Sequence, residues 1–177
     1  MTQELSVRPA RLDDLASIVS LRLALLREYH DHPLYMHLRP DASDRAFELY
    51  SAQLLSPHEA MFVAELGVGR HIVGILRCVD TLSSPLLLPE RYGYVSSAYV
   101  VPAQRKQGVL RALLTAAEQW CAARGIGEMR LHNSATSVVA AQAWDALGFE
   151  VVEQVRRRAL VATTAPRTMT REHVEAT

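Results

Sequence analysis

Two cations and a glycine stand together between a strand-like segment and a helix-like segment. The loop 103–107 contains Arg105 and Lys106 and leads into Gly108, after which apolar residues recur at helical spacing. The first turn of a helix has backbone N–H groups without internal partners, and the helix dipole adds partial positive charge there. Gly108 has no Cβ, so a ligand could approach the backbone closely. The pattern is typical of a diphosphate site, although an ordinary solvated turn can contain the same residues.

Histidine and tyrosine side chains provide candidate acid–base groups at two other places. Tyr29, His30 and His32 lie where the first predicted helix ends. Because histidine side chains titrate near neutrality, His30 or His32 could take a proton from a substrate amine, and a solvated helix end is the alternative. His132 and Asn133 close a short predicted strand. His132 is a candidate for contact with a substrate, or it makes only a local hydrogen bond.

A metal site at the first group of histidines is the weaker interpretation. His30 and His32 could be joined by Asp31 or His37 as ligands. The chain lacks a second spaced pair of ligands of the kind that structural zinc needs. We therefore predict no metal site.

The segment around the candidate anion site resembles a motif of a known superfamily. Residues 100–114, with Pro102, Arg105 and Gly108 at fixed places, resemble the coenzyme A motif of the Gcn5-related N-acetyltransferase (GNAT) superfamily. The core of that motif usually reads Gln or Arg, two residues, Gly, one residue, then Gly or Ala. Leu110 stands at the last of these positions, where a leucine leaves less room beside a pyrophosphate.

A second segment downstream resembles the second motif of the same superfamily. Residues 140–149 match a pattern that usually reads Asn-x-x-Ala-x-x-Phe-Tyr-x-x-x-Gly-Phe. Trp144 replaces the tyrosine and Ser137 replaces the asparagine. Ser137 keeps one hydroxyl for a cofactor, but it also suits a helix N-cap, which we prefer as its role. With a weaker N-terminal resemblance, the two motifs cover nearly the whole chain up to about Leu160.

The resemblance implies a fold and a donor. The fold would be a mixed, mostly antiparallel α/β sheet flanked by about four helices, with its fourth and fifth strands splayed apart. Here those strands would be Tyr92–Val101 and Glu128–His132. Unpaired backbone groups in the splay would bond the pantetheine amides of acetyl-CoA, the implied donor. The residues expected to contact the donor are Tyr99, Val100, Val101, Arg105, Lys106, Gln107, Gly108, Val109, Leu110, Arg111, Ser137 and Trp144.

Direct acetyl transfer to an amine needs a neutral amine, a polarised thioester carbonyl and a proton for the leaving thiolate. The resemblance assigns the carbonyl to a backbone N–H of the fourth strand, here that of Val100. Residues 95–98 read Val-Ser-Ser-Ala, so that strand lacks the glutamate that often serves as base. The indole of Trp144 is not a practical acid for a thiolate. Beside Val100, the catalytic candidates are therefore Tyr29, in the implied acceptor region, and His132.

The remaining chain reads as alternating strands and helices of one domain. Strands are expected at residues 5–9, 61–66, 71–78, 92–101, 128–132 and 150–161. Helices are expected to begin near Asp13 or Asp14, at about Ser43, after Gly108 and at about Ser137. Residues 1–161 would form the domain, and the polar, Thr-rich residues 162–177 a flexible tail.

Composition excludes several classes of partner. Lysine plus arginine and aspartate plus glutamate number 19 each, which argues against bulk electrostatic binding of nucleic acid or an anionic membrane. No apolar run approaches a membrane span, and the N-terminus lacks a signal-peptide pattern. Cys78 and Cys121 are expected to be buried thiols and not a disulfide. These features suit the cytoplasm, and a homodimer remains open.

We therefore predict a cytoplasmic acetyl-CoA-dependent N-acetyltransferase. It would act on a primary amine of a small molecule or peptide by direct transfer. The alternative is a coenzyme A binding module with little or no catalytic activity, which the departures at Leu110, Trp144 and Ser96 keep open.

Overall fold

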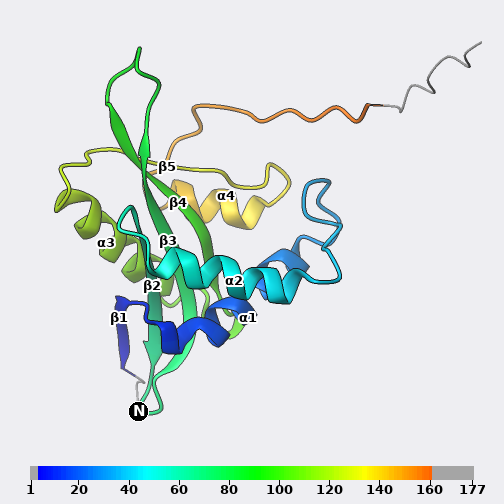
Figure 1. The fold of residues 1–177 in the computed structure, drawn as a ribbon, viewed down its shortest axis with the longest axis vertical. Helices are drawn as coiled ribbons and strands as arrows, with labels where there is room; N and C mark the ends of the chain where they lie inside the picture. Colours follow the sequence, from blue (N-terminus) through cyan, green and yellow to red (C-terminus); the bar gives the residue numbers. More distant parts are fainter. Residues whose placement is uncertain (1–3, 161–177) are drawn as a thin grey trace, which may run out of the picture.

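Five strands form one mixed sheet in the computed structural model, which describes residues 4–160 (Figure 1). The strands lie in chain order, and all neighbours are antiparallel except β4 and β5, which are parallel. Their bounds are Leu5–Pro9 for β1, Glu59–Leu66 for β2, His71–Leu82 for β3, Arg91–Val100 for β4 and Met129–Leu131 for β5. The predicted mixed, mostly antiparallel α/β fold is confirmed.

The described residues also form four α-helices and two short 3-10 helices. The α-helices are α1 (Leu15–Glu28), α2 (Ala42–Leu54), α3 (Val109–Ala122) and α4 (Val138–Asp145), and the 3-10 helices are η1 (Leu12–Asp14) and η2 (Pro102–Gln104). Helices α1 and α2 cover one face of the sheet and α3 covers the other (Figure 1). Each face of the sheet therefore has its own buried core.

The core under α3 brings the two cysteines together. Leu113, Leu114 and Cys121 of α3 are buried, as the helical spacing predicts. The Cys121 Sγ lies 3.6 Å from the Sγ of Cys78, and both are free thiols, as expected. Gly93 of β4 permits this packing, because a Cβ added there would lie only 2.6 Å from the Cys121 Sγ.

Arg8 joins the first strand to the start of α1. Its guanidinium donates to both carboxylate oxygens of Asp14 at 2.7 and 2.8 Å and also reaches Glu65 of β2. Asp14 is buried, and the hydrogen bonds from Arg8 hold its pKa below the ordinary aspartate value in spite of that burial. This network sets where α1 begins to cross the sheet.

Residues 150–160 form no strand, and our prediction of a final strand at 150–161 is wrong for the described part. Val151, Val152 and Val155 are 77%, 79% and 70% exposed. Strand β5 pairs with β4, and no described strand pairs with residues 150–160. The outer edge of β5 has no partner in the described sheet, yet residues 150–160 do not pair with it, so the β-branched composition of this segment was not sufficient to form a strand. Residue 161 and the predicted tail, 162–177, lie outside the described residues.

The length and apolar content of a helix decide whether it could cross a membrane. None of the helices in residues 4–160 is both long enough and apolar enough to cross a bilayer.

Candidate functional site

The parallel strands β4 and β5 pair over a short distance and then separate. The ladder joins Gly93–Val95 to Met129–Leu131, and β4 continues to Val100. The far side of that continuation is held by β3. Residues 96–100 thus leave one edge of β4 open, and the predicted splay between the fourth and fifth strands is present.

A bulge lies in the open part of β4. The register with β3 shifts between Ile75 and Arg77, and Ser97 has a positive φ of 53°. Beyond the bulge, the backbone N–H of Val101 donates to Val73 of β3 at 2.9 Å. Because successive N–H groups of a strand point in opposite directions, the N–H of Val100 points toward the open edge.

The N-terminus of α3 follows directly from this edge. Gly108 occupies the N-cap with a φ of 82°, a left-handed conformation that glycine adopts without cost, and Lys106 also has a positive φ, of 61°. No side-chain hydrogen bond caps the helix among the described residues. The amides of the first turn are therefore free to receive an anion, with the exposed Lys106 beside them.

Arg105 is directed away from that turn. Its guanidinium donates to both carboxylate oxygens of Glu28, at 2.7 and 2.8 Å, and to the carbonyl of Val100 at 2.9 Å. The hydroxyl of Tyr99 donates to the same carboxylate at 2.7 Å. Burial, followed by the Glu28 hydrogen bond, raises the Tyr99 pKa. Sequence reasoning missed Glu28, which joins the end of α1 to the loop before α3.

A tyrosine and a histidine meet where β4 and β5 separate. The hydroxyl of Tyr94 on β4 lies 2.9 Å from Nδ1 of His132, the residue just after β5. Tyr94 is half-buried, and burial raises its pKa. Sequence reasoning found His132 but not Tyr94. The expected parallel pairing of β4 with β5 could have indicated that Tyr94 and His132 lie close together.

The serines of β4 already have protein partners. The Ser96 hydroxyl receives a hydrogen bond from Nη1 of Arg77 at 3.2 Å, and Arg77 pairs in turn with Glu59 of β2. The hydroxyl of Ser97 lies 3.3 Å from that of Tyr50 on α2. The described β4 has no carboxylate, as the sequence indicated.

The comparison with known proteins agrees with this geometry. The family model described as "Acetyltransferase (GNAT) family" matches residues 23–149, which is most of the chain. The chain belongs to the GNAT acetyltransferase family. The resemblance predicted from the two motifs is thereby confirmed, and with it the assignment to a family of N-acetyltransferases.

Solved structures share the GNAT fold at low sequence identity. A predicted acetyltransferase from Clostridium acetobutylicum, solved with acetyl-CoA, has a TM-score of 0.72 and 16% identity over 88% of this chain and 96% of its own. The aminoglycoside N-acetyltransferase AAC(6')-Iy, solved with CoA, has a TM-score of 0.73 and 20% identity over 90% and 97%. Both ligands are of the class that the sequence predicts as donor.

One curated relative is more similar in sequence but over a short stretch. The aminoglycoside N(6')-acetyltransferase type 1 of Klebsiella aerogenes is 41% identical over 63 residues. That stretch is 36% of this chain and 41% of the relative, so this chain matches less than half of the relative's length.

Several residues expected to bind the GNAT donor have roles within the protein. Val109 is buried in the core under α3, and Leu110 packs against that core. The indole of Trp144 packs edge-to-face on Phe149 with ring centroids 5.4 Å apart. The hydroxyl of Ser137 accepts from the Ala140 N–H at 3.3 Å, which is the N-cap role that we preferred.

Polar residues near the start of α3 make local contacts. The side-chain amide of Gln107 donates to the Ala103 carbonyl at 3.0 Å, and Arg111 reaches the Ala146 carbonyl at 3.4 Å. Gly108 and Arg111 also line a surface hollow of about 470 Å³ that extends along α3 to Val7. This hollow offers room next to the free amides of the first turn.

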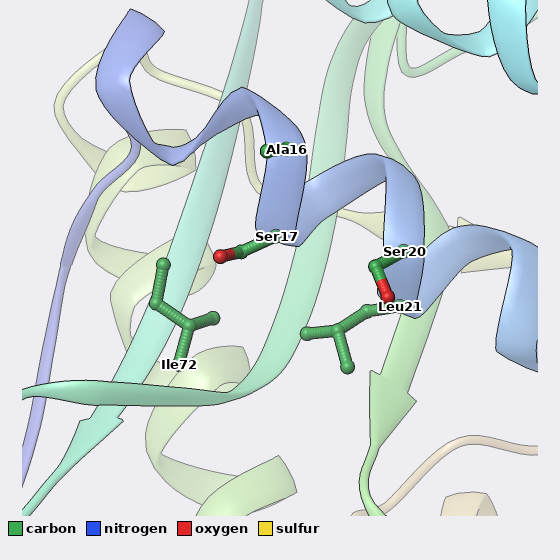
Figure 2. Close-up of a pocket in the computed structure, with 5 residues that line it drawn as sticks. All are labelled: Ala16, Ser17, Ser20, Leu21 and Ile72. Atoms are coloured by element: carbon green, nitrogen blue, oxygen red, sulfur yellow. The ribbon is translucent and has the colours of Figure 1, made fainter.

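Tyr29, another catalytic candidate from the sequence analysis, directly follows Glu28, whose carboxylate contacts Tyr99 and Arg105 at the open edge of β4. Tyr29 ends α1 in an aromatic group, with ring centroids 6.0 Å from His32 and 5.9 Å from Tyr35. Within residues 4–160, no group of three or more His, Cys, Asp or Glu side chains could hold a metal ion. A hollow of about 310 Å³ between α1 and Ile72 has only the hydroxyls of Ser17 and Ser20 as polar side chains, and it contains no titratable group (Figure 2).

Proposed function

We propose that this GNAT protein transfers the acetyl group of acetyl-CoA directly to a primary amine of a small molecule or peptide. The observation that carries the proposal is the open edge of β4 leading into an uncapped helix N-terminus. The edge suits the amides of pantetheine, and the helix N-terminus suits the diphosphate. The Klebsiella aerogenes relative and AAC(6')-Iy, both named for acetylation of aminoglycosides, support a small-molecule amine as acceptor.

The donor site rests mainly on backbone groups. The N–H groups of Gly108, Val109 and Leu110 and the charge of Lys106 would bind the diphosphate. Arg105 would act by holding the loop against Glu28 and Val100, because its guanidinium is already engaged there. The N–H of Val100 points to the open edge, where it can polarise the thioester carbonyl as negative charge develops on its oxygen.

The chemistry needs a base for the acceptor. Loss of the ammonium proton gives a neutral amine, whose nitrogen attacks the carbonyl carbon. A C–N bond forms, the C–S bond breaks, and the nitrogen loses a second proton, which passes through solvent to the thiolate. His132 is the proposed final acceptor of the ammonium proton: Nε2 takes it through solvent, because Tyr94, whose oxygen accepts from Nδ1–H at 2.9 Å, lies six residues before Val100 on β4.

The test is release of free CoA thiol from acetyl-CoA across a panel of primary amines. The proposal expects amine-dependent release, with N-acetylated product detected by mass spectrometry. A coenzyme A binding module would show acetyl-CoA binding in calorimetry without thiol release for any amine, and that result would rule out the proposed activity.

Two substitutions at Gly108 test the donor site. An added Cβ meets nothing within 4 Å, so Gly108→Ala should cost only the strain of φ 82°, about 1 kcal/mol of unfolding free energy. Gly108→Asp carries the same backbone strain and adds a negative charge beside the diphosphate. It should abolish thermal stabilisation by acetyl-CoA, whereas Gly108→Ala keeps a measurable shift. Equal ligand-induced shifts in the two variants would place the diphosphate elsewhere.

A further inference from the structure

The ion pair between Glu28 and Arg105 reaches the backbone of β4. Nη2 of Arg105 donates to both carboxylate oxygens of Glu28, at 2.7 and 2.8 Å, and Nε of the same guanidinium donates to the Val100 carbonyl at 2.9 Å. The Tyr99 hydroxyl donates to the Glu28 carboxylate at 2.7 Å, and the guanidinium carbon lies 5.4 Å from the centroid of the Tyr99 ring. Glu28 therefore fixes the direction in which the Arg105 side chain points.

The Val100 carbonyl lies at the open edge of β4. The register pairs Val100 with Gly74, and the N–H of Val101 donates to the carbonyl of Val73. In an antiparallel ladder this is the pattern of a non-hydrogen-bonded pair, so the N–H and the C=O of Val100 both point away from β3. Of these two groups at the open edge, Arg105 binds the carbonyl and leaves the N–H to meet a ligand.

This difference between the two polar groups of Val100 affects how an extended ligand adds to the edge. Pantetheine carries both carbonyl and N–H groups, so it could pair with an open strand in more than one register. A ligand oxygen placed at Val100 gains a hydrogen bond from the free N–H. A ligand N–H placed there must compete for the carbonyl with a charged donor, which makes the stronger hydrogen bond. The first of these registers is the one that acetyl transfer needs.

We propose that Glu28 is a positioning residue that, through Arg105, keeps the Val100 carbonyl engaged and thereby selects the register in which the thioester oxygen of the donor meets the Val100 N–H. The inference rests on the function proposed above and assigns Glu28 a part in it. The carboxylate acts on the donor only through the guanidinium of Arg105, which joins it to the backbone of β4.

The binding experiment compares acetyl-CoA with S-ethyl-CoA, a thioether analogue that lacks the carbonyl oxygen. Titration calorimetry with the full chain gives Kd for both ligands and requires no turnover. Wild type should bind acetyl-CoA about fivefold more tightly than S-ethyl-CoA, the scale of one net hydrogen bond. Glu28→Ala should reduce this ratio by about threefold or more, and it should lower kcat for thiol release about tenfold.

A matched control separates this effect from the loss of any exposed ion pair. Such a pair contributes little to stability, so Glu28→Ala should remain folded, which thermal unfolding checks. Glu128 also pairs with an arginine, Arg130, and the two pairs are similarly exposed. Glu128 lies beside Gly93, at the other end of β4 from Val100. Glu128→Ala should therefore keep the wild-type ligand ratio and kcat.

A double-mutant cycle tests whether Glu28 acts through Arg105. Arg105→Ala should lower the ligand ratio at least as far as Glu28→Ala does. The double variant should match Arg105→Ala, because the effects of two residues that act through one contact do not add. Glu28→Gln should keep part of the preference, since its amide oxygen can still accept a hydrogen bond from the guanidinium.

The outcomes separate this proposal from the proposed function. Equal affinities of wild type for the two ligands, an unchanged ratio in folded Glu28→Ala, or additive effects in the cycle would overturn the role of Glu28. Tighter binding of both ligands by Glu28→Ala would also overturn it, because the ion pair would then be keeping Arg105 from the diphosphate. Absence of thiol release with every amine contradicts the acetyltransferase function, whereas the ligand ratio decides the register without turnover.

Discussion

At the scale of single residues, the proposed role of His132 as base depends on its contact with Tyr94. A neutral imidazole with its proton on Nδ1 leaves Nε2 free to accept a proton, and the Tyr94 oxygen 2.9 Å away can hold that tautomer. In the proposed reaction, the same hydrogen bond would stabilise the imidazolium once Nε2 has accepted the proton. Tyr94 would then be a positioning residue for His132.

Tyr94→Phe should lower kcat about tenfold and leave the KM for acetyl-CoA unchanged, because one hydrogen bond to the developing charge is lost. Steady-state thiol release measures both constants. Tyr92→Phe is the matched control: the Tyr92 ring contacts Arg130, with the guanidinium carbon 4.1 Å from the centroid, and phenylalanine retains that contact. An equal fall in kcat for both variants would show that the effect is not specific to His132.

Packing of α3 on the sheet depends on a glycine at the start of the splay. A Cβ at Gly93 would lie 2.6 Å from the Cys121 Sγ and 3.2 Å from the Cys78 Sγ. Both thiols are buried, and burial raises their pKa values, so they remain neutral packing groups. The close packing of Cys121 of α3 and Cys78 of β3 against β4 therefore requires a residue without a side chain at Gly93.

Gly93→Ala should reduce the unfolding free energy by roughly 1–3 kcal/mol, the usual cost of overpacking a core. In the Cys121→Ala background the same change should cost less, because the nearest sulfur is gone. Urea unfolding of the four proteins of this double-mutant cycle gives the coupling. Equal costs in the two backgrounds would mean that the strain at Gly93 arises from another neighbour.

At the scale of the whole molecule, stability depends on charges that lock β1, β2 and α1 together. Arg8 holds the carboxylates of Asp14 and Glu65, and its hydrogen bonds lower the folded-state pKa of Asp14. A carboxylate with a lowered folded pKa contributes stability above its unfolded pKa of about 3.9. That contribution is lost as the pH falls through the folded pKa.

Asp14→Asn should reduce the unfolding free energy at pH 7 by about 2 kcal/mol, the scale of a hydrogen bond to a charged group. The difference from wild type should shrink as the pH is lowered below about 4, where the wild-type carboxylate becomes protonated. Urea unfolding between pH 7 and pH 3 measures it. The exposed Asp13→Asn is the control. A difference that stays constant down to pH 3 would contradict the role of the ionised carboxylate.

Sequence reasoning was most accurate where a feature depends on neighbouring residues. The stripe of Leu113, Leu114 and Cys121 predicts the buried face of α3, because helical spacing alone places those side chains together. Gly108 predicts the end of the loop for the same local reason, since few other residues adopt a left-handed N-cap. Ser137 caps its helix through an N–H only three residues away. The motifs around these residues were sufficient to identify the family.

Tertiary structure alone decided which distant side chains meet. The guanidinium of Arg105 forms an ion pair with Glu28, 77 residues earlier in the chain. The positive charge that the motif assigns to binding an anion is therefore neutralised by another residue of the protein. Tyr94 reaches His132 across 38 residues because β4 and β5 are parallel neighbours. Residues 150–160 have the composition of a strand but pair with no described strand. Propensity is a property of a segment, whereas pairing and charge neutralisation require a second segment whose position only the folded chain determines.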